Sequence, residues 1–201
     1  MHPVCLCREV YRRLHPIIRE RFYQKKLMYV RNYVEGLDVS WQSFFGTDER
    51  LKVERYCKSA GIDWQWTQGN GLRTTKICSA VSGHPATAEK IFFNQIQLHH
   101  PSCLEPSVRE TLAAMFSEES FPRNVYYGDG SPIEDSVVDE IKGLYDEVAV
   151  AFRWQEDDIL MLDNMLTAHA RNPYEGPRKI VVAMGELINE SDLTDGSGNQ
   201  R

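Results

Sequence analysis

His169 and Arg178, near the end of the chain, could bind a metal ion and a carboxylate side by side. A neutral imidazole is a good ligand for Fe(II), and a guanidinium can hold a carboxylate by two parallel hydrogen bonds. Residues 172–177 between them contain two prolines and a glycine, which indicates a loop. If this loop joins two antiparallel strands, both side chains lie at one end of a sheet. We therefore expect His169 and Arg178 to face inward together at the mouth of one sheet.

Two segments have the composition of the strands that this arrangement needs. Residues 159–162 form a short apolar run, which Asp163 and Asn164 end with side chains that favour turns. Residues 179–184 are apolar and rich in β-branched side chains, as is typical of a buried strand. The sequence therefore predicts an antiparallel pair formed by these two segments. We expect Arg171, in the connection, to pair with Asp163.

The same region resembles the C-terminal signature of the TauD/TfdA-like family of Fe(II)- and 2-oxoglutarate-dependent dioxygenases, in particular its syringomycin-type hydroxylase branch. The matching elements are, in order, Trp154, an acidic approach, a strand, Asp163-Asn164, His169-Ala170-Arg171 and Gly176-Pro177-Arg178. Residues 27–33, 35–41, 92–100 and 124–135 also resemble segments of that branch, so the resemblance runs from about Arg8 to Glu186. It implies that His169 is an iron ligand and that Arg178 grips the far carboxylate of 2-oxoglutarate.

The resemblance also implies an activity. Enzymes of this family use Fe(II) and 2-oxoglutarate, and they couple decarboxylation of the 2-oxoglutarate to hydroxylation of an unactivated C–H bond. Substrates in this branch are amino acids or related small metabolites, in some cases held on a carrier protein, and the genes lie beside those for peptide antibiotics. The expected role is therefore that of an oxidoreductase in antibiotic biosynthesis.

Two of the three iron ligands of the family have no counterpart in this sequence. They come as a His-x-Asp or His-x-Glu motif, and none of the six histidines is followed two positions later by Asp or Glu. By alignment from Cys7, the family's Gly-Gly-Glu/Asp-Thr element would fall at or before His2. We interpret residues 1–188 as the C-terminal portion of such a domain, in an N-terminally truncated member. We expect it to be inactive as given, either as an oxygenase fragment or as a non-catalytic remnant that serves as an interaction or regulatory module.

Other residues that could bind a metal have simpler structural interpretations. His99 and His100 follow an apolar run, but adjacent residues of a strand point to opposite faces, so a shared site with His169 is disfavoured. Cys5 and Cys7 lack a second pair of cysteines, so we expect free thiols rather than a zinc site. The aromatic residues of segment 35–47 fit a packed cluster better than a lid over a substrate.

Composition narrows the class of protein. The chain has 201 residues, 42% of them hydrophobic, and a net charge of -6, which disfavours general nucleic-acid binding. No apolar run is long enough to span a bilayer, and no signal peptide is evident. Five scattered cysteines fit a reducing compartment, so a cytoplasmic location is expected, with neither nucleic acid nor membrane as a partner.

The remaining patterns predict a mixed fold. We expect helices at 8–26, interrupted or kinked at Pro16, and at 48–60, 106–116 and 133–152. We expect strands at 27–33, 62–66, 72–81 and 90–98, a turn at 68–71, a loop at 35–47 and a disordered tail at 189–201. The expected fold class is α+β or mainly β, a partial double-stranded β-helix (jelly-roll-like) with flanking helices. Because a cut barrel exposes an edge strand, we also expect self-association.

Overall fold

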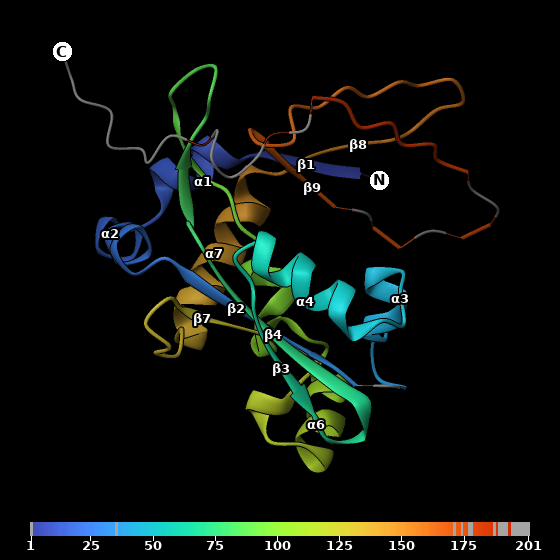
Figure 1. Cartoon of the computed structure of the whole chain (residues 1–201). Coiled ribbons are helices and arrows are strands. Elements are labelled where there is room, and N and C mark those ends of the chain that lie inside the picture. Colours follow the sequence, from blue (N-terminus) through green and yellow to red (C-terminus); the bar gives the residue numbers. More distant parts are fainter. Residues whose placement is uncertain are drawn as a thin grey trace. The chain divides into compact units, whose positions relative to one another are not determined.

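The chain is described by a computed structural model (Figure 1), which combines helices with several antiparallel sheets, so the mixed class expected from the sequence is confirmed. The structure describes residues 2–34, 36–170, 172–173, 175–176, 179–186, 188 and 193. The chain divides into two compact units. The first unit comprises Met1–Arg19, Ala80–Asn94 and Glu140–Arg201, and the second comprises Glu20–Ser79 and Gln95–Asp139.

The first unit contains a three-stranded antiparallel sheet in the order β8-β1-β9. These strands are β1 (His2–Leu6), β8 (Val150–Phe152) and β9 (Thr167–His169). Val4 of β1 lies opposite Val150 on one side and opposite His169 on the other. A second sheet of this unit pairs β5 (Val81–Gly83) with β6 (Lys90–Phe92). The first strand of the chain therefore holds two strands from its last quarter.

Pro16 divides the first helical segment, as the sequence predicts. Helix α1 (Cys7–Arg13) ends just before His15, and α2 (Pro16–Lys25) begins at the proline. A residue before proline is pushed out of the helical region, whereas proline itself fits the first turn because its missing N–H would have no partner there. Cys7 and Val10 are the buried side chains of α1.

The second unit contains a four-stranded antiparallel sheet in the order β3-β4-β2-β7 (Figure 1). Its strands are β2 (Leu27–Tyr33), β3 (Asp63–Thr67), β4 (Gly71–Cys78) and β7 (Arg123–Tyr127). The 3-10 turn η1 (Gln68–Asn70) joins β3 to β4, and Gly69 and Asn70 adopt φ values of 66° and 63°. Glycine and asparagine are the residues that tolerate this left-handed backbone, so the turn expected at 68–71 is confirmed.

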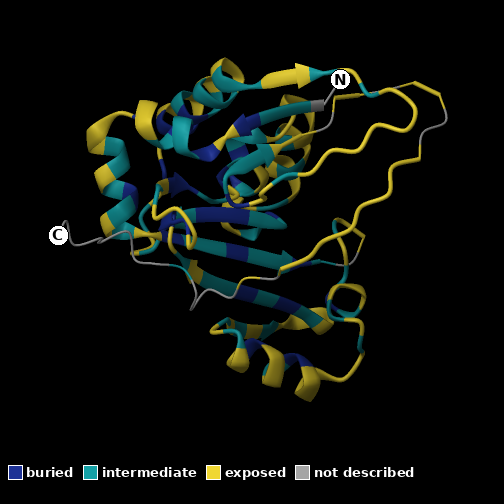
Figure 2. Ribbon diagram, turned by 90° about the horizontal axis from the view of Figure 1, so that it is seen from above, coloured by how far each residue is buried: buried dark blue, intermediate teal, exposed yellow. Residues whose placement is uncertain are grey.

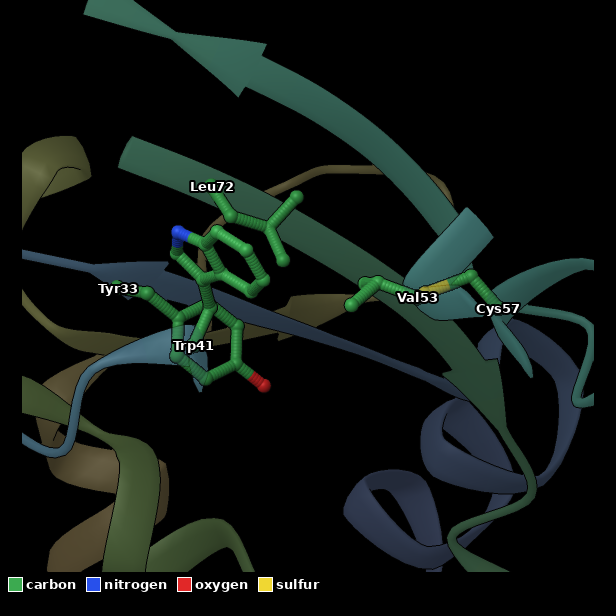
Figure 3. Close-up of a cluster of buried hydrophobic side chains, with 5 residues drawn as sticks. All are labelled: Tyr33, Trp41, Val53, Cys57 and Leu72. Atoms are coloured by element: carbon green, nitrogen blue, oxygen red, sulfur yellow. The ribbon is translucent and has the colours of Figure 1, made fainter. Parts of the chain in front are cut away.

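Helices and 3-10 turns lie between the strands along the chain. They are α3 (Trp41–Phe45), α4 (Arg50–Ser59), α5 (Ile96–His99), α6 (Pro106–Met115) and α7 (Asp135–Val148), with 3-10 turns η2 (Pro101–Cys103) and η3 (Glu118–Ser120). Val53 and Cys57, one helical turn apart on α4, are fully buried. They pack with side chains of β2, α3 and β4 in the cluster drawn in Figure 3, which consists of Tyr33, Trp41, Val53, Cys57 and Leu72.

The structure corrects two expectations in the second unit. The loop expected at 35–47 contains α3, where the Ser40 side chain accepts a hydrogen bond from the Ser43 amide at the helix start. Its aromatic residues form a packed cluster with Tyr33, as expected, because Trp41 is buried there. Helix α4 begins at Arg50 rather than at residue 48, and the side chain of its N-cap residue Glu49 makes no capping bond.

The strand expected at 90–98 is wrong beyond Phe92. The chain leaves β6 and turns into α5, so residues 96–99 are helical. The side chain of Asn94 donates to the carbonyl of Ala80, and the amide of Gln95 donates to the Tyr29 hydroxyl. The backbone amide of Gln95 thus binds a side chain instead of a neighbouring strand.

The two strands expected at 159–162 and 179–184 are also wrong, since neither segment lies in a strand. Figure 2 shows most of the coil after β8 as exposed. Ile159 is 95% exposed, Met161 93% and Met184 86%. Strand-like composition alone gives no sheet without a partner, and in the described part of the chain β1 pairs with β8 and β9 instead. Of the tail 189–201, only Leu193 lies within the described residues, where it packs against Cys7, Ile91 and Met165.

Candidate functional site

His169 is the last residue of β9 and is exposed. It lies opposite Val4, and the next residue, Ala170, donates its amide to the carbonyl of Pro3 at 3.0 Å. On the other side of His169, Ala168 and Thr167 lie opposite Cys5 and Leu6 of β1. The main chain is therefore bound to β1 on both sides of His169. An imidazole in this place is accessible to a metal ion while its backbone is fixed.

Asp163 organises the turn that leads into β9. Its Oδ1 accepts hydrogen bonds from the amides of Met165 and Leu166, at 2.9 and 3.2 Å. Its carbonyl accepts from the amide of Thr167 at 3.0 Å. Aspartate commonly closes turns by accepting from amides two or three residues further on. Asp163 thus ends the exposed coil and starts the strand that carries His169.

His84 is the side-chain partner that the structure describes for Asp163. Its Nε2 lies 2.9 Å from Oδ2 of Asp163, and the imidazole is buried, with 5% of the residue exposed. Its Nδ1 accepts the amide N–H of Thr87 at 3.1 Å. Burial raises the pKa of the Asp163 carboxyl, but the hydrogen bonds from Leu166, Met165 and His84 outweigh it and hold that pKa below its usual value. Asp163 is therefore an ionised acceptor at neutral pH.

Arg178 and Arg171 lie outside the described residues. The expected approach of Arg178 to His169, and of Arg171 to Asp163, therefore stay predictions. The strand pair that was to bring His169 and Arg178 together is not formed by 159–162 and 179–184. Within the described residues, His169 is placed instead by β1, a strand that the sequence analysis did not anticipate.

His99 and His100 lie at the end of α5 rather than on a strand. His100 is buried, its Nε2 donates to the carbonyl of Ile133 at 3.1 Å, and its Nδ1 accepts from the amide of Ser102 at 3.2 Å. Both ring nitrogens of His100 are therefore used within the protein. The structural role expected of His100 is confirmed.

The cysteine pair near the start of the chain fits the expected free thiols. Cys5 and Cys7 are both reduced and buried. Burial, together with the neighbouring Cys5, raises the pKa of the Cys7 thiol to about 12. A thiol held in its neutral form is a poor metal ligand, because metals bind the thiolate.

Across the part of the chain that the structure describes, no three His, Cys, Asp or Glu side chains are grouped closely enough to hold a metal ion. A family iron site needs two imidazoles and a carboxylate. The described residues thus offer His169 as one candidate ligand and do not complete an iron site.

The family assignment comes from comparison with known proteins. The family described as "Taurine catabolism dioxygenase TauD, TfdA family" matches residues 1–184. The chain belongs to this family. It is 40% identical over 163 residues to the dapdiamide synthesis protein DdaC of Enterobacter agglomerans, which covers 81% of this chain and 50% of that protein. It is 27% identical over 193 residues to the clavaminate synthase-like protein At3g21360 of Arabidopsis thaliana, which covers 90% of this chain and 55% of that protein.

Membership of the TauD, TfdA family confirms the resemblance at family level. The chain spans about half the length of the curated relatives that it matches. Among the described helices, none has the length and apolar composition needed to cross a membrane. The sequence analysis missed His84, because its partner Asp163 lies 79 residues further along the chain.

Proposed function

We propose that this chain is the C-terminal portion of a hydroxylase-type oxygenase that depends on Fe(II) and 2-oxoglutarate. His169 would supply one iron ligand, and Arg178 would bind the far carboxylate of 2-oxoglutarate. The observation that carries the proposal is the family match over residues 1–184. The exposed imidazole of His169 on a main chain held at both sides by β1 supports its assigned role.

The proposed substrate is an amino acid or a related small metabolite, free or held on a carrier protein. Similarity to a relative named for dapdiamide synthesis supports a role in a biosynthetic pathway, in line with the syringomycin-type branch. Five free cysteines support a reducing, cytoplasmic location.

The isolated chain should not turn over 2-oxoglutarate. A single imidazole leaves an iron ion held mainly by water, because affinity and geometry come from several ligands fixed in place. One guanidinium offers a contact of roughly 1.5–3 kcal/mol, whereas a dissociation constant of 1 mM needs about 4 kcal/mol. Activity therefore requires the ligands that the described residues do not provide.

The test is succinate release with Fe(II), ascorbate and 2-oxoglutarate across a panel of amino acids. The chain is assayed alone and as a fusion to the half of DdaC that it does not match. The two parts of the fusion follow each other in the same order as in DdaC. We expect no release from the chain alone and iron-dependent release from the fusion. His169→Ala and Arg178→Ala should abolish it, while the surface controls His15→Ala and Arg153→Ala should not.

Three outcomes would contradict parts of the proposal. Release from the isolated chain that His169→Ala abolishes would mean that the chain has a full set of ligands. Release from the fusion that survives His169→Ala would exclude His169 as a ligand. A folded fusion that binds neither iron nor 2-oxoglutarate would favour the alternative of a non-catalytic interaction or regulatory module.

A further inference from the structure

His84 connects two segments of the first unit that lie far apart in sequence. It follows β5 directly, in the turn that leads to β6, while its partner Asp163 lies four residues before the first residue of β9. The turn at His84 is well defined, because its amide donates to the Glu89 carbonyl and its carbonyl accepts from the Ala88 amide. The imidazole is therefore held by a rigid hairpin and reaches out to the turn before β9.

The two ring nitrogens of His84 have different roles. An amide N–H can only donate, so Nδ1, which faces the Thr87 amide, must carry the lone pair. In the neutral imidazole Nε2 then carries the hydrogen and donates to Oδ2 of Asp163. One nitrogen closes the local turn, and the other bonds to Asp163.

The bond matters for β9 because of where Asp163 lies. Residues 155–161 before it are exposed, and Met165 after it is buried against Cys7 and Ile91. Asp163 is thus where the chain returns from an exposed coil to the core. Its Oδ2 is bound by His84, and its Oδ1 and carbonyl bind the amides of residues 165–167. A fixed Asp163 carboxylate therefore sets the direction in which the chain runs from the turn into β9.

We propose that His84 is a positioning residue for His169: by donating to Asp163 it fixes the turn from which β9 begins, and thereby the place at which the His169 imidazole emerges. The importance of that place rests on the proposed function, in which His169 is an iron ligand. We call the bond from His84 to Asp163, together with the bonds from the amides of residues 165–167 to Asp163, the relay. The relay does not depend on iron, so it can be tested on the full chain without metal.

Two conservative variants separate the two roles of His84. A glutamine amide can reach the position of Nε2, so His84→Gln keeps a donor for Asp163 and loses the acceptor for Thr87. An asparagine oxygen can take the position of Nδ1, so His84→Asn keeps the local turn and loses the donor. Asp163→Asn removes the charge and one acceptor site, yet its side-chain oxygen still accepts from the amides of Met165 and Leu166.

The measurement is amide hydrogen exchange by NMR, with the amides of Ala170 and Cys7 as reporters. The Ala170 amide, directly after β9, donates to the carbonyl of Pro3 in β1, and the Cys7 amide, at the start of α1, donates to the carbonyl of Leu166 just before β9. We expect His84→Asn to speed exchange at both reporters by about three- to tenfold, the effect of losing one hydrogen bond, and His84→Gln to stay near wild type. The ring signals of His169 should shift in the asparagine variant only. Amides of the β2–β4 ladder serve as the control for global unfolding.

The double-substitution cycle keeps the test decisive if a single variant is unstable. His84→Asn and Asp163→Asn should each speed exchange, and the double variant should be no worse than the worse single one. Additive effects would overturn the relay. So would a His84→Gln variant that loses protection while His84→Asn keeps it, since the role of His84 would then be confined to its own turn. Inactivity of the oxygenase fusion with an intact relay would count against the proposed function and leave the relay standing.

Discussion

The ring of His99 lies edge-on against the ring of Tyr29, with centroids 4.8 Å apart and planes inclined by 62°. His99 closes α5 and Tyr29 lies on β2, and both bind the main chain of Gln95. The Tyr29 hydroxyl accepts from the Gln95 amide at 2.8 Å, and Nδ1 of His99 donates to the Gln95 carbonyl at 3.1 Å. Burial in this contact lowers the pKa of His99 below 6.5, and the positive charges of Arg123 and Arg31 add to that effect.

This contact predicts a pH dependence of stability. The folded pKa of His99 is depressed, so as the pH falls below about 6.5 the unfolded chain takes up the proton first. The contribution of His99 to the free energy of unfolding is therefore present above that pH and falls as the pH drops toward the folded pKa. Urea denaturation at pH 7.5 and pH 5.5 (roughly one unit either side of the ordinary value) measures it. His99→Gln should reduce the difference in the free energy of unfolding between the two pH values, whereas the exposed control His15→Gln should leave this difference as it is in the wild type. An equal difference in the wild type and both variants would refute the prediction.

Thiol reactivity should follow burial. Cys5, Cys7 and Cys57 are buried, and burial raises the pKa of all three thiols, while Cys78 and Cys103 are partly exposed. Because the thiolate is the reactive species, an alkylating reagent at mildly alkaline pH should label Cys78 and Cys103 first. Mass spectrometry of labelled peptides, before and after denaturation, gives the order. Labelling of Cys7 in the native chain as fast as Cys103 would show that the packing of Cys7 against Ile91 and Met165 opens in solution.

Substitutions in the core should lower the free energy of unfolding far more than substitutions at the surface. Leu72 is 1% exposed within the cluster of Figure 3, so Leu72→Ala should lower the free energy of unfolding by about 2–5 kcal/mol. Met161 is 93% exposed, so Met161→Ala should change it by less than about 0.5 kcal/mol. Denaturant titration compares the two. A large cost at Met161 would mean that this segment is packed in solution.

Exposed apolar side chains predict self-association. Ile159, Met161, Val181, Val182 and Met184 are each more than 70% exposed. Apolar side chains concentrated on a surface favour contacts between molecules. Sedimentation should show association that grows with concentration, and Met161→Lys with Val182→Lys should weaken it. The matched control is Gln155→Lys with Gln68→Lys, which adds the same charge elsewhere. A compact wild-type monomer at all concentrations would contradict this prediction.

The sequence predicted the elements that depend on residues close together in the chain. Strand β2 has the predicted bounds, and Pro16 divides the first helix as expected. The strand expected at 90–98 failed because a short apolar run fits a helix as well as a strand, and the contacts of Asn94 and Gln95 decide between them. The strands predicted at 159–162 and 179–184 were wrong because the composition of a segment does not show which strand it would pair with.

The candidate site shows the same division. His169 was identified from its place in a pattern with Asp163 and Arg178 that resembles the family signature, and this pattern can be recognised in the sequence. The partner strand β1 of His169 and the His84–Asp163 bond were not identified, because both depend on contacts between distant parts of the chain. Position 84 offered only a His in a turn, and its function depends on a carboxylate 79 residues further on.

The place of β1 in the middle of its sheet sets the order in which this unit can fold. Its two neighbours, β8 and β9, are the last strands described in the chain. During synthesis from the N-terminus, β1 can pair with β8 only after Phe152 has left the ribosome, and with β9 only after His169 has done so. Pairing over such a separation is slow, and an open strand is prone to wrong partners while it waits. The sheet contact that holds His169 is therefore among the last that this unit can form.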